Sequence, residues 1–236
     1  MRSSDPRPRI AVIMPALNEE KSLPGILSSM PDYVHRVVVS DNGSTDGTAE
    51  VARAHGAEVV FEAERGYGAA CLAGIRHLSG QGEPPEVLVF IDADGSDDPN
   101  EIADVVAPIQ KGEADMVLGV RRGIDGDVGT ILPHARFGNH LVLGLTQLLF
   151  GHSFTDLPPF RAVSFPELLG LHMDDRTWGW TLQMQIRAVR SGLRIVEVEV
   201  SHRRRSEGVS KISGNLATSL KVGAKMFYTL ARERLR

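Results

Sequence analysis

The stretch at residues 87–99, VLVFIDADGSDDP, constrains the fold of this chain more than any other. Its uninterrupted apolar run is typical of a strand that is covered on both faces of a sheet. Because side chains two residues apart in an extended chain point the same way, Asp92 and Asp94 are predicted to present their carboxylates together where the strand ends. Paired carboxylates suit Mg²⁺ or Mn²⁺, with substrate phosphates filling the remaining positions. A solvated acidic turn is the alternative, and it is the better interpretation of an isolated DxD pair.

Composition limits the class of protein. The 236 residues are 42% hydrophobic and 24% charged, which fits one α/β domain, with or without a subdomain. The formal net charge of −4 argues against a general nucleic-acid binder. The single cysteine, Cys71, favours a reducing compartment, so we expect a cytoplasmic protein. No signal peptide is expected, and the apolar segment 141–150 is about half of the roughly 20 residues that a spanning helix needs. A soluble or peripheral protein is therefore expected.

Strands alternate with helices through the first half, which predicts a largely parallel, doubly wound α/β sheet. The first helix is predicted to open directly after Pro15 with Asn18 as its N-cap. The expected strands lie at residues 10–14, 36–40, 58–62, 87–91 and 114–120. Each is followed by a small or polar cluster: PALNE, DNGSTDGT, ERGYGAA, DADGS and VRRG. Ligands bind at the carboxyl edge of such sheets, so five clusters at that edge favour a nucleotide pocket over a set of ordinary turns.

The second half is less regular. Helices are predicted at 133–150, at 180–190 and from about 216 onward, with a strand at 193–200 that has one wet face. Residues 156–161, DLPPFR, are interpreted as a loop, and Trp178-Gly179-Trp180 as core or as a wall for a sugar or acceptor. The chain is expected to divide into a disordered leader at 1–8, a nucleotide-sugar half at 9–123, an acceptor-side half at 124–212 and a basic amphipathic helix at 213–236.

The ordered motifs PALNEE, DNGSTDGT and DADGSDDP resemble the nucleotide-sugar half of family 2 glycosyltransferases, across residues 10–123. The second half resembles the dolichyl- or polyprenyl-phosphate sugar synthase branch. The motifs that carry this second resemblance are Asp156 with Phe160-Arg161, then Trp178-Gly179-Trp180, and RSEGVSK at 205–211. The chain departs from the branch pattern at Pro158-Pro159, and Ser96 stands where relatives can have a metal-holding Gln.

The resemblance implies a Rossmann-like GT-A fold with an acceptor-side subdomain, and a metal-dependent, inverting hexose transfer from a nucleotide sugar to a polyprenyl phosphate. Mg²⁺ or Mn²⁺ on Asp92 and Asp94 would neutralise the departing diphosphate of a GDP-mannose or UDP-glucose type of donor. The donor-binding residues that the resemblance implies are Pro15, Ala16, Glu19, Asp41, Gly66, Gly68 and Asp92. The carboxylates of Glu19 and Asp41 can accept hydrogen bonds from a base or ribose, and helix-start positions favoured by the dipole are their alternative role. The Gly66-x-Gly68 pattern lacks the third glycine of an NAD site.

The acceptor decides which further residues matter. A phosphate acceptor needs cations and no base, and the resemblance assigns its binding to Arg121, Arg136, Arg205, Ser210 and Lys211, with Arg121 and Arg205 also acting in catalysis. A hydroxyl acceptor needs a general base, for which Asp156, Asp174 and Asp175 are candidates. A nucleotidyltransferase would be expected to show a Gly-rich basic N-terminal loop, and PALNEE is not such a loop. A non-catalytic nucleotide-sugar binding module would bind the donor without turnover.

The last helix carries basic and apolar residues together, which fits either a membrane surface or packing on the domain or on a partner subunit. The sequence identifies neither the donor nor the acceptor, and it does not distinguish the preferred metal or the oligomeric state.

Overall fold

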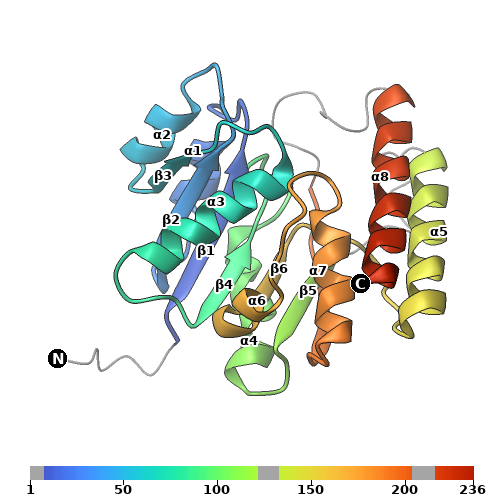
Figure 1. Ribbon diagram of the computed structural model, residues 1–236. Helices are drawn as coiled ribbons and strands as arrows, with labels where there is room; N and C mark the ends of the chain where they lie inside the picture. Colours follow the sequence, from blue (N-terminus) through green and yellow to red (C-terminus); the bar gives the residue numbers. More distant parts are fainter. Residues whose placement is uncertain (1–7, 122–132, 204–215) are drawn as a thin grey trace.

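A computed structural model describes residues 8–121, 133–203 and 216–236 (Figure 1). Within these residues one sheet has the strand order β3-β2-β1-β4-β6-β5-β7. The strands are β1 (Ile10–Ala16), β2 (Val34–Asp41), β3 (Glu58–Phe61), β4 (Val87–Phe90), β5 (Met116–Arg121), β6 (Arg161–Ser164) and β7 (Ile195–Val200). All pairings are parallel except those of β6 with β4 and β5. The predicted largely parallel α/β sheet is confirmed.

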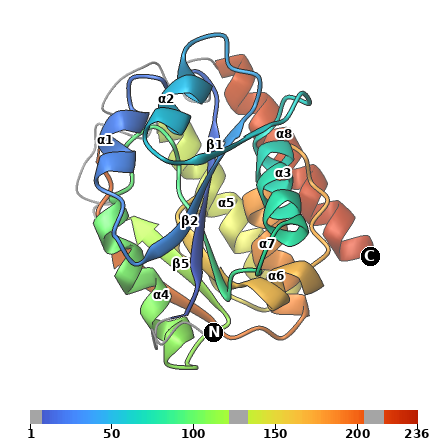
Figure 2. The same cartoon turned by 90° about the vertical axis from the view of Figure 1, so that its left-hand side faces the viewer.

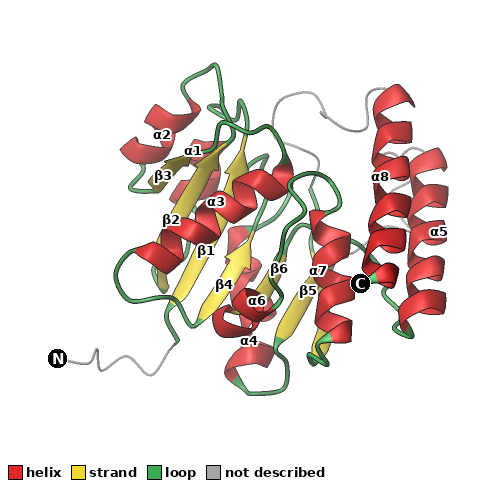
Figure 3. Ribbon diagram, viewed as in Figure 1, coloured by secondary structure: helices red, strands yellow, loops and turns green. Residues whose placement is uncertain are grey.

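Helices cover both faces of this sheet (Figures 1 and 3). They are α1 (Leu23–Ser28), α2 (Thr48–Ala54), α3 (Tyr67–Gly80), α4 (Ile102–Gln110), α5 (Pro133–Phe150), α6 (Phe165–Gly170), α7 (Trp180–Arg190) and α8 (Leu216–Leu235), with a 3₁₀ turn, η1 (Pro99–Glu101), before α4. Figure 2 shows α1, α2 and α4 on one side of the sheet and α3, α6 and α7 on the other. Side chains that alternate along β1 divide accordingly, with Val12 in the first apolar layer and Ile13 in the second.

A third apolar cluster joins α5, α7 and α8 beside the main core. It centres on Val142, Leu182, Ile186 and Leu230, all of which are buried. Helices α5 and α8 stand next to each other at one end of the molecule (Figure 1). The C-terminal helix is therefore packed on the domain along this face, while Phe227 and Tyr228 stay exposed on its other side.

Strand β6 was not predicted. Residues 156–160 form the loop that was expected, but Arg161, the last residue of that range, begins the strand. The strand is only four residues long, begins with an arginine and follows two prolines, so it has none of the usual strand signals. It forms because β4 and β5 pair with it on both sides. Pairing with distant strands thus overrides a sequence that favours a loop.

The predicted helix after Pro15 is wrong. Asn18 has a φ of +54° and caps no helix, and α1 begins only at Leu23 after Ser22. Asparagine tolerates this left-handed conformation better than most residues. Its side-chain oxygen instead accepts hydrogen bonds from Thr45, in the loop that follows β2.

Candidate active site

A pocket of about 410 Å³ opens at the carboxyl edge of the sheet, and we call it the edge pocket. Its lining comes from the end of β1, the segments after β1, β2, β3 and β4, the start of α3, and Thr177 and Trp178 ahead of α7. The lining residues are Pro15, Ala16, Leu17, Glu19, Asn42, Arg65, Gly66, Tyr67, Ala70, Asp92, Ala93, Asp94, Thr177 and Trp178. Four of the five polar clusters therefore meet as predicted. The roles of these residues in binding stay predictions.

The loops after β1 and β2 are joined by hydrogen bonds between motif residues. The backbone N–H of Asn18 donates to Ser44 Oγ at 2.9 Å, and that of Glu19 donates to Thr48 Oγ1 at 2.8 Å. Glu20 accepts from the Gly47 N–H at 2.8 Å. PALNEE and DNGSTDGT thus fix each other, and this leaves the Glu19 side chain at the pocket.

Two predicted donor residues, Asp41 and Gly68, do not line the edge pocket. Asp41 is buried, and its Oδ1 accepts from the Ser44 N–H at 2.9 Å. Gly68 lies against the backbone of Asp175, whose carbonyl oxygen a Cβ at Gly68 would overlap. Gly68 thus allows the backbone of Asp175 to approach closely, and Asp41 stabilises the loop that follows β2.

Asp92 and Asp94 reach the same pocket by a turn and not, as predicted, by strand alternation. Strand β4 ends at Phe90, and residues 93 and 94 lie in a turn that Asp94 Oδ1 stabilises by accepting from the Ser96 N–H at 2.9 Å. Ser22 Oγ donates to the Ala93 carbonyl at 2.8 Å, which ties the turn to α1.

The donor set around this turn fits a hard divalent cation. Asp97 lies beside the pair, and within the described residues its buried Oδ1 and the Nδ1 of His202 both lack a hydrogen bond although they lie 3.8 Å apart. A buried carboxylate oxygen without a donor favours a neighbouring positive charge. In the described part of the chain, however, no three His, Cys, Asp or Glu side chains form a complete metal site. A cation here therefore needs further ligands, such as phosphate oxygens.

Tyr67 brings a neutral phenol to the edge pocket. Burial, with the nearby charge of Asp92, raises the pKa of Tyr67 well above its ordinary value. Arg65, by contrast, is exposed, and its guanidinium lies over Gly43. The residue types alone could not distinguish Arg65 and Tyr67 from ordinary loop residues, but both belong to the ERGYGAA cluster whose position was predicted.

Arg121, predicted to bind the acceptor phosphate, pairs with Asp156. Its Nε and Nη2 donate to the two carboxylate oxygens at 2.7 and 2.6 Å. Burial works against the charged form, but the hydrogen bonds and charge of Asp156 outweigh it and raise the pKa of Arg121. A buried carboxylate in such a pair is held by the arginine, so Asp156 is a poor general base.

Asp174 and Asp175, the other candidate bases, are also paired. Asp174 accepts from Arg187, Arg232 and Arg236, and although burial opposes it, the hydrogen bond from Gln183 and these arginines lower its pKa. Asp175 lies 2.8 Å from the ammonium of Lys225. Neither carboxylate lines the edge pocket.

Most of the predicted acceptor-phosphate set lies outside the described residues. This holds for Arg205, Ser210 and Lys211, and also for the side chain of Arg136 on α5. Arg203, two residues before Arg205, is the last described residue ahead of this set. It pairs with Asp98, and its N–H donates to the Ser96 carbonyl at 2.8 Å. Arg203 is therefore attached to the turn that carries Asp92 and Asp94.

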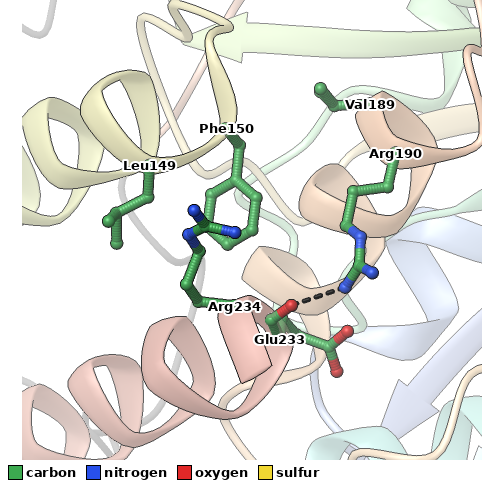
Figure 4. A pocket seen from close by; sticks show the side chains of 6 residues that line it. All are labelled: Leu149, Phe150, Val189, Arg190, Glu233 and Arg234. Carbon is green, nitrogen blue, oxygen red and sulfur yellow. Dashed lines mark hydrogen bonds between the residues drawn. The ribbon is translucent and has the colours of Figure 1, made fainter. Parts of the chain in front are cut away.

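A second, smaller cavity of about 270 Å³ lies between the C-terminal ends of α5, α7 and α8 (Figure 4). Its lining residues are Leu149, Phe150, Val189, Arg190, Glu233 and Arg234, none of which was predicted to have a role. Arg190 donates to the backbone carbonyl of Glu233. The cavity shares no lining residue with the edge pocket.

Residues 11–170 match the model of the family described as Glycosyl transferase family 2. The chain belongs to that family. It is therefore an enzyme, a glycosyltransferase with the GT-A type of α/β fold that the motifs implied. Among the described residues, the helices are all too short or too polar to pass through a bilayer.

Individual relatives agree with this membership. An uncharacterized glycosyltransferase of Mycobacterium tuberculosis is 39% identical over 89% of this chain and 93% of its own length. The undecaprenyl-phosphate mannosyltransferase of Micrococcus luteus is 30% identical over 95% of this chain and 96% of its own. Glucosyl-3-phosphoglycerate synthase of M. tuberculosis, solved with Mn²⁺, uridine diphosphate and phosphoglyceric acid, is 25% identical with a TM-score of 0.75, covering 96% of this chain and 78% of that one.

Proposed function

We propose that this glycosyltransferase moves a hexose from a nucleotide sugar to a polyprenyl phosphate, with inversion at the anomeric carbon. The observation that carries the proposal is the edge pocket, where Asp92 and Asp94 meet Glu19 and the ends of β1 to β4. The solved neighbour that binds uridine diphosphate and Mn²⁺ supports the donor side. The undecaprenyl-phosphate mannosyltransferase, which matches over nearly the whole chain, supports the acceptor side.

On the donor side, Pro15, Ala16 and Glu19 hold the base and ribose, and Gly66 lets the chain pass close to the sugar nucleotide. Asp92 and Asp94 hold Mg²⁺ or Mn²⁺, which when bound neutralises charge on the departing diphosphate. Tyr67, which lines the pocket, offers a hydrogen bond from its phenol hydroxyl. The donor is of the GDP-mannose or UDP-glucose type.

On the acceptor side, a phosphate is favoured over a hydroxyl because the candidate bases are occupied. Asp156, Asp174 and Asp175 each face a cationic side chain. A phosphate is already ionised and needs positive charge instead. Arg121, Arg136, Arg205 and Lys211 supply it, and Ser210 adds a hydroxyl donor. Arg205 lies two residues after Arg203, which is attached to the metal-binding turn.

A lipid acceptor places the enzyme at a membrane surface, on its cytoplasmic side. Exposed apolar side chains stand on the two helices that lie side by side at one end of the molecule: Leu141 and Leu148 on α5, and Phe227 and Tyr228 on α8. Such side chains can enter the interfacial layer of a bilayer.

The test is transfer of radiolabelled sugar from a panel of nucleotide sugars, with Mg²⁺ or Mn²⁺, into a bacterial lipid extract. We expect label in the organic phase that mild acid releases, because a sugar 1-phosphate linkage to a polyprenol is acid-labile. Label only in a water-soluble product would instead favour a soluble acceptor, as for the neighbour solved with phosphoglyceric acid. Label that stays on every nucleotide would contradict both acceptor classes.

A further inference from the structure

Residues 174–179, which we call the wall segment, supply one side of the edge pocket through Thr177 and Trp178. The segment lies directly against the start of α3. A Cβ at Gly66 would overlap the Arg176 carbonyl oxygen, and the N–H of Ala69 donates to that same oxygen at 2.9 Å. The two backbones are in direct contact at this point, so a shift of the wall segment changes the shape of the edge pocket.

On its other side the wall segment contacts α8. A Cβ at Gly179 would overlap both Asp175 Oδ2 and Thr229 Oγ1, so glycine is required where α8 passes. Thr229 is buried and donates to the Lys225 carbonyl at 2.9 Å, which keeps its side chain close to its own helix. The wall segment is thus enclosed between α3 and α8.

One carboxylate connects α8 with the pocket lining. Asp175 is 1% exposed, and its Oδ1 accepts from the Thr177 N–H at 2.8 Å and from Thr177 Oγ1 at 3.1 Å. Its Oδ2 receives no hydrogen bond among the described residues and lies 2.8 Å from Lys225 Nζ. A buried carboxylate needs such a compensating charge. Lys225 therefore acts on Thr177 through Asp175.

A second network of ion pairs fixes α8 both to α7 and to the wall segment. Arg187 donates to both oxygens of Glu233 at 2.8 and 3.0 Å, and Glu233 is buried. Arg232 and Arg236 pair with Asp174, the first residue of the wall segment. Lys225 is consequently not needed to keep α8 in place, so the effect of its contact with Asp175 is to be sought at the pocket lining.

We propose that Lys225 and Asp175 are positioning residues for the sugar nucleotide: their ion pair sets the place of Thr177 and Trp178, so that α8 controls donor affinity. This rests on the edge pocket being the donor site. Because coupling between two sites is reciprocal, donor binding would also alter the energy of the α8 contact. The C-terminal helix would then sense whether the donor is present.

The experiment compares Lys225→Met with Lys221→Met, which removes the same charge one turn earlier on α8, at an exposed position with no ion pair to another described residue. Binding of UDP and of GDP, each with Mn²⁺, is measured by calorimetry on the full chain. We expect Lys225→Met to raise Kd about tenfold, in the range of coupling between contacting groups, and Lys221→Met to leave Kd unchanged. Lys225→Arg should restore affinity. In transfer assays the donor KM should rise similarly while kcat stays within about twofold.

The double variant Asp175→Asn with Lys225→Met separates positioning from folding, because it leaves no uncompensated buried charge. We expect it to melt near the wild-type temperature and still to bind nucleotide about tenfold more weakly. Wild-type affinity in the double variant, or in Lys225→Met, would overturn the coupling while leaving the donor site intact. Failure of the wild type to bind any nucleotide would overturn the donor site and the coupling together.

Discussion

The loops after β1 and β2 and the corner where α7 meets α8 are held together in different ways. The loops use short side chains of recognisable motifs, such as Ser44 and Thr48, which accept from backbone N–H groups of the facing loop. The corner uses long charged side chains, such as Arg187 with Glu233, 46 residues apart. Motif residues therefore shape the chemistry at the edge pocket, whereas the corner supplies stability that motifs do not reveal.

The variant Asp94→Asn should distinguish the two regions most clearly, because it should reduce activity without reducing stability. Loss of a metal-holding carboxylate should reduce transfer by at least about a thousandfold, because several kcal/mol of charge stabilisation disappear. The melting temperature should stay close to that of the wild type, since the neutral side chain can still accept from the Ser96 N–H. Transfer rates and thermal melting are measured on the same samples. Asp104→Asn, an exposed change on α4, is the control, and near-normal turnover by Asp94→Asn would refute the metal assignment.

Arg187→Met, in contrast to Asp94→Asn, should lower stability. It leaves the carboxylate of Glu233, 1% exposed, without its two-point partner, and we expect the free energy of unfolding to fall by about 3 kcal/mol. Urea denaturation measures this change. Arg234→Met, an exposed change on the same corner, should alter stability by less than about 0.5 kcal/mol. Equal stability of the two variants would show that the corner does not depend on this pair.

Glu58→Gln tests whether the first half also depends on ion pairs, and its effect should be the smallest. Hydrogen bonding to Arg36, helped by His77 and opposed by burial, lowers the pKa of Glu58 from 4.5 to about 2. A lowered folded-state pKa stabilises the fold above the unfolded value, and this contribution is lost as the pH falls from about 4.5 toward 2. Because the side chain is 35% exposed, the effect should be a few tenths of a kcal/mol. Urea unfolding is measured at pH 7 and at pH 3. The difference in the free energy of unfolding between wild type and variant should be smaller at pH 3, and a larger difference at pH 3 would contradict the lowered pKa of Glu58.

Most of the fold followed from local patterns. Apolar runs and, for β7, alternation predicted six of the seven strands of the described sheet. Gly56 and Gly192, with φ of +82° and +70°, lie just after α2 and α7, where glycine adopts the left-handed conformation that ends a helix. Strand β6 could not be predicted, because Arg161 inside it is buried only through its tertiary surroundings. Burial lowers its pKa to about 10, and its guanidinium donates to the Thr181 carbonyl.

The site was predictable on one side only. Pro15 lies at the end of β1, and Glu19 and Asp92 come within three residues of the ends of β1 and β4, so topology places them at one edge. The opposite side depends on how the second half folds back. Trp178 lines the edge pocket while Trp180, two residues later, is 1% exposed in the core, and nothing in the sequence distinguishes the two aromatic residues.

The antiparallel direction of β6 means that the chain leaves the sheet after β5 and returns to it at the same edge. Strand β5 ends and β6 begins at the same edge of the sheet, and the Gly119 N–H donates to the Phe160 carbonyl at 2.9 Å. The Arg121–Asp156 pair closes the excursion near its base. A segment whose two ends already meet can be lengthened, shortened or exchanged without altering the strands beneath it. Changes in this part of the chain would therefore leave the order and register of the strands intact, and would act instead on α5 and on the apolar cluster that it shares with α7 and α8.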